Sequence, residues 1–140
     1  MASASVELVQ SICATWAEGS FGGVPEWAHP EIEYVVVEGP SPTTFRGLAE
    51  LAAGMRDLLS PWEDYRAEAV EYRELDDERV LVLIRRSGCG KRSGLELDAS
   101  WPRGAEIVHI KQGRVTRIVK YFDRDRALAD LGISPEADSP

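Results

Sequence analysis

Residues 105–128 read AEIVHIKQGRVTRIVKYFDRDRAL, and this stretch decides the fold. Its two halves are rich in β-branched and apolar residues, which predicts strands over 105–110 and 115–122. The glycine-containing turn between them joins the two strands as a hairpin. Asp123 then stands where a helix N-cap is expected, ahead of a short closing helix. The stretch therefore predicts a strand hairpin that runs directly into a helix.

Helices are expected in the first half of the chain and strands in the second. One helix face carries Val9, Ile12, Cys13 and Trp16 at the i, i+3, i+4, i+7 spacing. A second apolar stripe begins at Leu48 and ends near Pro61. Further strands are expected over 32–37, 67–75, 80–86 and 95–101, with a loop over 39–44. This order implies an α+β fold, a curved antiparallel sheet with the N-terminal helices packed on its concave face.

Length and charge exclude several classes of protein. The 140 residues suit one domain, with an ordered core expected over about 5–133 and a polar tail over 134–140. The net charge of −8 argues against nucleic-acid binding and against docking on an anionic membrane. No apolar run approaches the roughly 20 residues of a membrane helix. Without a secretory signal, the sequence predicts a cytoplasmic protein with Cys13 and Cys89 as free thiols.

No metal or cofactor is expected. The two histidines lie far apart, and the two cysteines have no spacing typical of a metal site. No glycine-rich phosphate-binding loop precedes a helix. A basic cluster at a predicted hairpin tip, formed by Arg85, Arg86, Lys91 and Arg92, is expected to be solvated.

Three stretches together resemble the SnoaL-like branch of the nuclear transport factor 2-like superfamily. They are 27–47 (WAHPEIEYVVVEGPSPTTFRG), 75–94 (LDDERVLVLIRRSGCGKRSG) and 105–128. The resemblance implies a cone-shaped α+β barrel with an internal pocket. It also implies a homodimer through the outer sheet face, where Arg117, Val119 and Tyr121 would face the partner. It does not specify an activity, because this fold hosts isomerases, cyclases, hydrolases and non-catalytic binders.

The pocket is expected to be mainly apolar and to bind a small apolar molecule. Its expected lining is Trp16, Trp27, Tyr34, Met55, Trp62, Val108, Ile118 and Phe122. The alternative is that these large side chains belong to an ordinary core, where most such residues are found.

Glu38 is the first candidate catalytic residue. Ketosteroid-isomerase relatives carry a proton-transferring carboxylate nine residues before a glycine, and Glu38 precedes Gly47 by nine. A carboxylate beside aromatic rings at a pocket mouth would have a raised pKa. This chain has Glu in place of Asp, and Pro40 comes one residue later than in those relatives. The alternative is that Glu38 faces solvent in a loop.

Glu106 and Lys120 are the second candidates. SnoaL-type polyketide cyclases carry a His and an Asp fourteen residues apart on adjacent strands, and Glu106 and Lys120 hold those positions here. Strand alternation places both on one face, where they would form an ion pair inside the pocket. The pair could be an acid/base couple, an anchor for an anionic ligand or a structural salt bridge. The missing His/Asp pair argues against the aldol cyclase mechanism itself.

Two functional classes follow from the sequence. One is a cofactor-free isomerase, cyclase or hydrolase that uses a carboxylate base on an apolar ligand. The other is a ligand-binding or dimerising module without chemistry.

Overall fold

A computed structural model describes residues 4–18, 24–37, 42–60, 62–90 and 104–133. Its elements in chain order are α1 (Ala4–Ala17), α2 (Val24–Trp27), β1 (Ala28–Val37), β2 (Thr43–Arg46), α3 (Gly47–Leu59), β3 (Trp62–Asp76), β4 (Arg79–Gly90), β5 (Gly104–Lys111), β6 (Arg114–Tyr121) and α5 (Arg124–Asp130). The predicted α+β class is confirmed. Glu38, the predicted strand 95–101 and the tail 134–140 lie outside the described residues.

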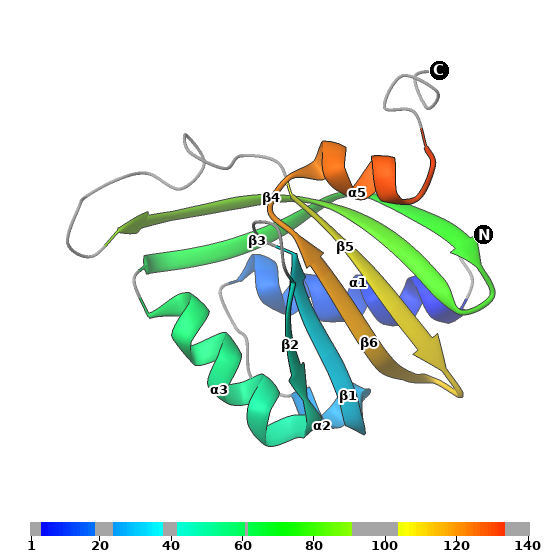
Figure 1. Cartoon of the computed structure of the whole chain (residues 1–140), viewed down its shortest axis with the longest axis horizontal. Helices are drawn as coiled ribbons and strands as arrows, with labels where there is room; N and C mark the ends of the chain where they lie inside the picture. The colour runs from blue at the N-terminus through cyan, green and yellow to red at the C-terminus, as the bar shows by residue number, and fades with distance from the viewer. Residues whose placement is uncertain (1–3, 19–23, 38–41, 61, 91–103, 134–140) are drawn as a thin grey trace.

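The described strands form one curved, open sheet in the order β2-β1-β6-β5-β4-β3 (Figure 1). Neighbouring strands are antiparallel except β1 and β6, which run parallel and make the sheet mixed. The central hairpin of β5 and β6 pairs Glu106 directly with Lys120. Side chains of directly opposed residues project from the same face of a sheet, so the predicted common face of this pair is confirmed.

Helices α1 and α3 cover the concave face of the sheet (Figure 1). The four residues of the predicted α1 stripe, Val9, Ile12, Cys13 and Trp16, are all buried in the cluster that this face shares with the sheet. Burying such a stripe is the main stabilising contribution that an amphipathic helix makes. The space that remains between these helices and the sheet is where the candidate site lies.

The short closing helix α5 packs on the opposite face of the sheet. Ala127 and Leu128 are buried there against apolar side chains of β1, β4, β5 and β6. Asp123 caps the helix as predicted, because its side chain accepts a hydrogen bond from the Asp125 backbone N–H at 3.0 Å.

The position of α5 corrects the residues predicted to face a partner, while the homodimer itself stays a prediction. Val119 and Tyr121 are only 8% and 5% exposed, within the apolar cluster of the outer face to which α5 contributes. The Tyr121 hydroxyl donates a hydrogen bond to Asp130 of α5 at 2.8 Å. Of the three residues expected to face a partner, only Arg117 is exposed, where it lies 3.9 Å from Glu33.

Strand β2 was not predicted, and strands β1, β3 and β4 extend beyond their predicted bounds. Strand β2 forms partly inside the predicted loop 39–44, because Thr43–Arg46 pairs with β1. Strand β3 begins at Trp62 rather than residue 67, since its first residues pair with the end of β4. That end, residues 87–90, was expected in a hairpin loop and is strand. The extension of β3 brings Tyr65 into the sheet, within a register shift between Glu63 and Arg66. The extension of β4 continues the strand past Arg86, the last residue of the predicted strand.

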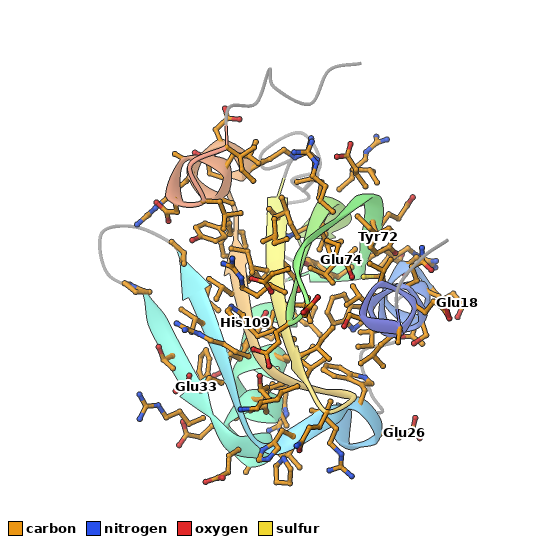
Figure 2. All side chains as sticks on the ribbon, turned by 90° about the vertical axis from the view of Figure 1, so that its right-hand side faces the viewer. Glu18, Glu26, Glu33, Tyr72, Glu74 and His109 are labelled. Atoms are coloured by element: carbon orange, nitrogen blue, oxygen red, sulfur yellow. The ribbon has the colours of Figure 1, made fainter. Side chains whose placement is uncertain are left out.

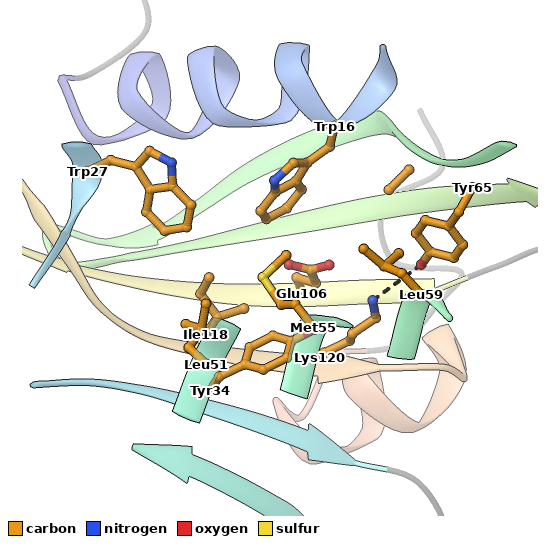
Figure 3. Close-up of a pocket in the computed structure, with 11 residues that line it drawn as sticks. Trp16, Trp27, Tyr34, Leu51, Met55, Leu59, Tyr65, Glu106, Ile118 and Lys120 are labelled. Atoms are coloured by element: carbon orange, nitrogen blue, oxygen red, sulfur yellow. Dashed lines mark hydrogen bonds between the residues drawn. The ribbon is translucent and has the colours of Figure 1, made fainter. Parts of the chain in front are cut away.

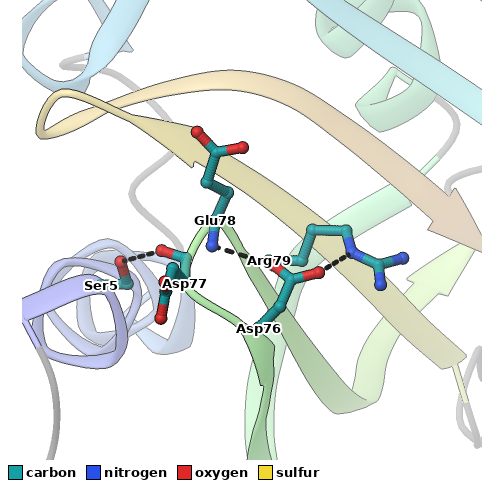
Figure 4. Close-up of polar contacts among 5 residues, drawn as sticks. All are labelled: Ser5, Asp76, Asp77, Glu78 and Arg79. Carbon is teal, nitrogen blue, oxygen red and sulfur yellow. Dashed lines mark hydrogen bonds and ion pairs between the residues drawn. The ribbon is translucent and has the colours of Figure 1, made fainter.

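The turn between β3 and β4 ties the hairpin to the start of α1 (Figure 4). Asp76 accepts hydrogen bonds from the Glu78 backbone N–H at 2.9 Å and from Arg79 Nε at 2.7 Å. The hydrogen bond from Arg79 is the main reason that the pKa of the Asp76 carboxyl is lowered. The Ser5 hydroxyl donates a hydrogen bond to the Asp77 carbonyl oxygen at 3.5 Å.

No helix in the described part of the chain is long and apolar enough to cross a membrane.

Candidate functional site

A cavity lies between the sheet and helices α1 and α3 (Figure 3). It is lined by Trp16, Trp27, Tyr34, Leu51, Met55, Leu59, Tyr65, Ala67, Glu106, Ile118 and Lys120. The empty space among these side chains, including the part open to solvent, is about 430 Å³. The centre of a water molecule can occupy only about 20 Å³ of it, which is room for about one water. A larger ligand therefore requires lining side chains to move.

Five of the eight predicted lining residues border this cavity: Trp16, Trp27, Tyr34, Met55 and Ile118. Val108 is buried in the neighbouring core, and Phe122 is partly buried beside that core. Trp62 begins β3, but its side chain lies outside the described residues.

Four lining residues were not predicted from the sequence. Leu51 and Leu59 stand four residues on either side of Met55, so the spacing of α3 could have identified them. Tyr65 and Ala67 alternate on β3, which the sequence predicted to begin only at residue 67.

Glu106 brings a carboxylate into this apolar space from the middle of β5 (Figure 3). The residue is 3% exposed, and among the described residues its Oε1 has no hydrogen-bond partner. Burial raises the pKa of the Glu106 carboxyl, while the positive charges of Lys120 and Arg86 partly oppose the increase. A buried carboxylate without full hydrogen bonding is costly, so its position is not explained by stability.

Lys120 enters the same cavity from β6 and is 4% exposed. Its ammonium group donates a hydrogen bond to the Tyr65 hydroxyl at 3.3 Å. Burial acts to lower the pKa of Lys120, but Tyr34, Tyr65 and Glu106 favour the charged form and the net direction is upward. Burial also raises the pKa of Tyr34 to about 12, so this phenol is neutral near pH 7.

The predicted ion pair is not formed as a direct contact. No Glu106 oxygen lies within 4 Å of Lys120 Nζ among the ion pairs of the described residues. The physical reason is that Lys120 extends toward Tyr65, which supplies a hydrogen-bond acceptor (Figure 3). The carboxylate and the ammonium group therefore face one cavity without neutralising each other by contact.

Arg86 corrects the expectation of a solvated basic tip. It is fully buried, because β4 continues past it and the alternation of Val80, Val82 and Ile84 carries it to the inner face. Its Nη2 donates to the Tyr121 carbonyl oxygen at 2.7 Å, and its guanidinium carbon lies 4.6 Å from the centre of the Phe122 ring. Arg86 Nε and Nη1 are buried without partners among the described residues. Arg85 is exposed, and Lys91 and Arg92 lie outside the described residues.

Gly104 provides the space that the Arg86 guanidinium occupies. A Cβ at this position would lie 2.3 Å from Arg86 Nη2 and 2.6 Å from its Cζ. We expect Gly104→Ala to lower the free energy of unfolding by about 1–3 kcal/mol, because the enclosed guanidinium cannot move away. Urea unfolding measures this change. In an Arg86→Met background, Gly104→Ala should lower the free energy of unfolding by markedly less. An equal decrease in both backgrounds would contradict the close approach of Gly104 to the Arg86 guanidinium.

The remaining titratable groups do not suggest a metal centre. No group of three or more His, Cys, Asp or Glu side chains gathers to hold a metal ion within the described ranges. Cys13 is buried, and burial is the main cause that raises the pKa of its thiol to about 12. The thiol is therefore protonated and unreactive near pH 7.

Comparison with known proteins identifies relatives of this architecture. The model of the SnoaL-like domain family matches residues 9–118. A solved NTF2-like protein from Burkholderia pseudomallei K96243 superposes with a TM-score of 0.72 at 19% identity, over 91% of this chain and 97% of that one. TerC, co-crystallised with polyporic acid, gives 0.69 at 21% identity, over 92% and 98% of the two chains. No curated protein is significantly similar in sequence.

A third solved structure combines this architecture with a bound small molecule. It is a protein with a ketosteroid isomerase-like fold from Catenulispora acidiphila DSM 44928, in complex with trimethylamine. The TM-score is 0.64 at 16% identity, over 96% of this chain and 98% of that one. At these identities the solved structures establish a shared fold.

Proposed function

Because the chain belongs to the SnoaL-like domain family, we propose that its cavity is a cofactor-free enzyme site that transfers a proton on a small apolar carbonyl compound. The observation that carries this proposal is the placement of Glu106. It is a buried carboxylate without a partner for Oε1 among the described residues, in an otherwise mainly apolar cavity. Perturbed titratable groups in cavities are typical of functional sites.

Glu106 is proposed as the general base. A carboxylate with a raised pKa is better matched to proton transfer near neutral pH than an ordinary glutamate. It would take a proton from the carbon next to a carbonyl group, and the electron pair of the broken C–H bond would become that of an enolate. Where a C=C bond is conjugated with the enolate, return of the proton to the far carbon of that system would complete an isomerisation. Attack of the enolate carbon on a second carbonyl carbon of the same molecule, whose oxygen would take up the proton, would close a ring.

Lys120 and Tyr65 are proposed to stabilise the enolate oxygen. The Lys120 ammonium group is held by the Tyr65 hydroxyl, and both groups line the cavity with Glu106. Donors that are fixed before the reaction stabilise a developing negative charge at little reorganisation cost. The apolar walls would hold the body of the ligand, with Trp16 and Trp27 in an edge-to-face pair at 6.3 Å.

The structural neighbours support a small-molecule ligand. TerC was co-crystallised with polyporic acid, and the Catenulispora protein with trimethylamine. These ligands belong to those proteins and leave the substrate of this chain to experiment. Glu38, which lies outside the described residues, stays a second proposed base.

Exchange of the α-protons of 2-tetralone in D₂O tests the proposal, because this bicyclic ketone matches an apolar cavity and needs no cofactor. Proton NMR measures the loss of signal against a protein-free control. Catalysed exchange above the control supports an enzyme. Binding of 2-tetralone without catalysed exchange would favour the alternative, a ligand-binding module.

The pH dependence of this exchange should follow Glu106. The base must be ionised, and burial raises its pKa above the ordinary 4.5. The catalysed rate is therefore expected to rise with pH through a value above 4.5 and then level off. It should stay level to about pH 10, because the pKa of Lys120 is raised above 10.5. A rate that rises only below pH 4.5 would contradict the role of Glu106.

A further inference from the structure

We infer that the cavity binds its ligand through a negatively charged group, held by Lys120 in the field of Arg86. The inference deepens the proposed function, on which it rests for the location of the ligand. The ligand class is an organic anion, with an apolar ring body and one acidic oxygen group such as a carboxylate.

Among the described residues, the charges buried on the inner face of the sheet do not balance. The buried charged side chains of the described residues are Arg86, Glu106 and Lys120, at 0%, 3% and 4% exposed. Their sum is +1 when Glu106 is ionised and +2 when it is protonated. Burying an uncompensated charge is costly, so a ligand that brings a negative charge gains more here than a neutral one.

Lys120 retains hydrogen-bonding capacity for such a group. An ammonium group has three donors. The structure gives one of them to the Tyr65 hydroxyl at 3.3 Å, and the Tyr34 phenol interacts with the same ammonium. At least one donor is left for a ligand atom in the cavity that Lys120 lines.

Arg86 strengthens the positive end of the cavity without lining it. The Arg86 guanidinium and the Lys120 ammonium both lie near the Phe122 ring, at 4.6 Å and 5.7 Å from its centre. Arg86 Nε and Nη1 remain without partners among the described residues. Charges in a dry interior act over longer distances than in water, so Arg86 contributes to the field that an anion on Lys120 would meet.

The walls fit the body of such an anion. Trp16, Trp27, Met55 and Leu59 offer apolar surface in the cavity that Glu106 and Lys120 also line (Figure 3). Trp27, Met55 and Leu59 are only partly buried, so they can shift to admit a ring. Met is flexible and adapts readily to different shapes.

Calorimetric titration with 2-naphthoate and 2-naphthamide tests the inference, because the two probes share ring and size and differ in charge. The wild type is expected to bind 2-naphthoate at least about 10-fold more tightly than 2-naphthamide. Lys120→Met should reduce this ratio to about one. The matched control Lys111→Met, which changes an exposed lysine at the end of β5, should leave the ratio unchanged.

The outcomes separate this inference from the proposed function. Equal binding of the two probes to the wild type overturns the anion site but leaves a proton-transfer site for neutral ligands. If neither probe binds, the anion site is overturned. Exchange of 2-tetralone then still tests the proposed function. A ratio that persists in folded Lys120→Met overturns the assignment to Lys120. If that variant does not fold, the wild-type comparison decides alone.

Discussion

Replacing Glu106 by glutamine is expected to lower the catalysed exchange of 2-tetralone by about 10²–10⁴-fold. Glutamine has nearly the same size and shape as glutamate, but its amide cannot accept the proton. The loss should appear in the rate constant at saturating 2-tetralone, with little change in binding, because the reaction step loses its base. NMR exchange rates at several ketone concentrations separate the two effects.

Two further variants sharpen this result. Glu74→Gln removes an exposed carboxylate from the edge strand β3 (Figure 2) and should leave the exchange rate unchanged. Glu38→Gln tests the other proposed base. Full activity of Glu106→Gln together with loss of activity in Glu38→Gln would assign the role of base to Glu38. Full activity of both variants would contradict catalysis by either carboxylate.

The same Glu106→Gln substitution is expected to stabilise the protein at pH 7, by on the order of 1–3 kcal/mol. The folded-state pKa of Glu106 is raised above 4.5, so the folded protein holds this proton more tightly than the unfolded chain. The stability from this group is fully present below pH 4.5 and is lost as pH rises through the folded-state pKa. Glutamine stays neutral and avoids that loss.

Urea unfolding of wild type and Glu106→Gln at several pH values measures the effect. The difference should be small below pH 4.5 and should grow toward pH 7. A structural salt bridge predicts the opposite sign, since removing one member of a buried pair costs about 3–5 kcal/mol. Destabilisation of that size would favour the alternative that Glu106 and Lys120 form a structural salt bridge. Stabilisation with loss of activity is the trade-off typical of functional sites.

The sequence was most informative where local patterns repeat. The α1 stripe was predictable, because helical spacing alone identifies residues such as Val9 and Trp16 that are buried together. The β5–β6 hairpin was predictable for the same reason. Strand alternation across a short turn placed Glu106 and Lys120 on one face, and the structure pairs them directly.

The contacts of the site depend on residues far apart in the chain. Lys120 donates to Tyr65, which is 55 positions away, and no local pattern indicates that choice. The burial of Arg86 requires both the extension of β4 and the missing side chain at Gly104 on the next strand. Val119 and Tyr121 were wrongly predicted to be exposed, because the alternation of β6 does not show that α5 returns to pack beside them.

The most direct test of the account is the pKa of the Glu106 carboxyl. Titration of ¹³C-labelled glutamate side chains by NMR, in wild type and in Glu106→Gln, assigns its signal as the one that the substitution removes. We expect a pKa above 4.5, because the carboxyl is buried in a largely apolar cavity. A pKa at or below 4.5 would show a stabilised carboxylate instead of a poised base, and would contradict the proposed site.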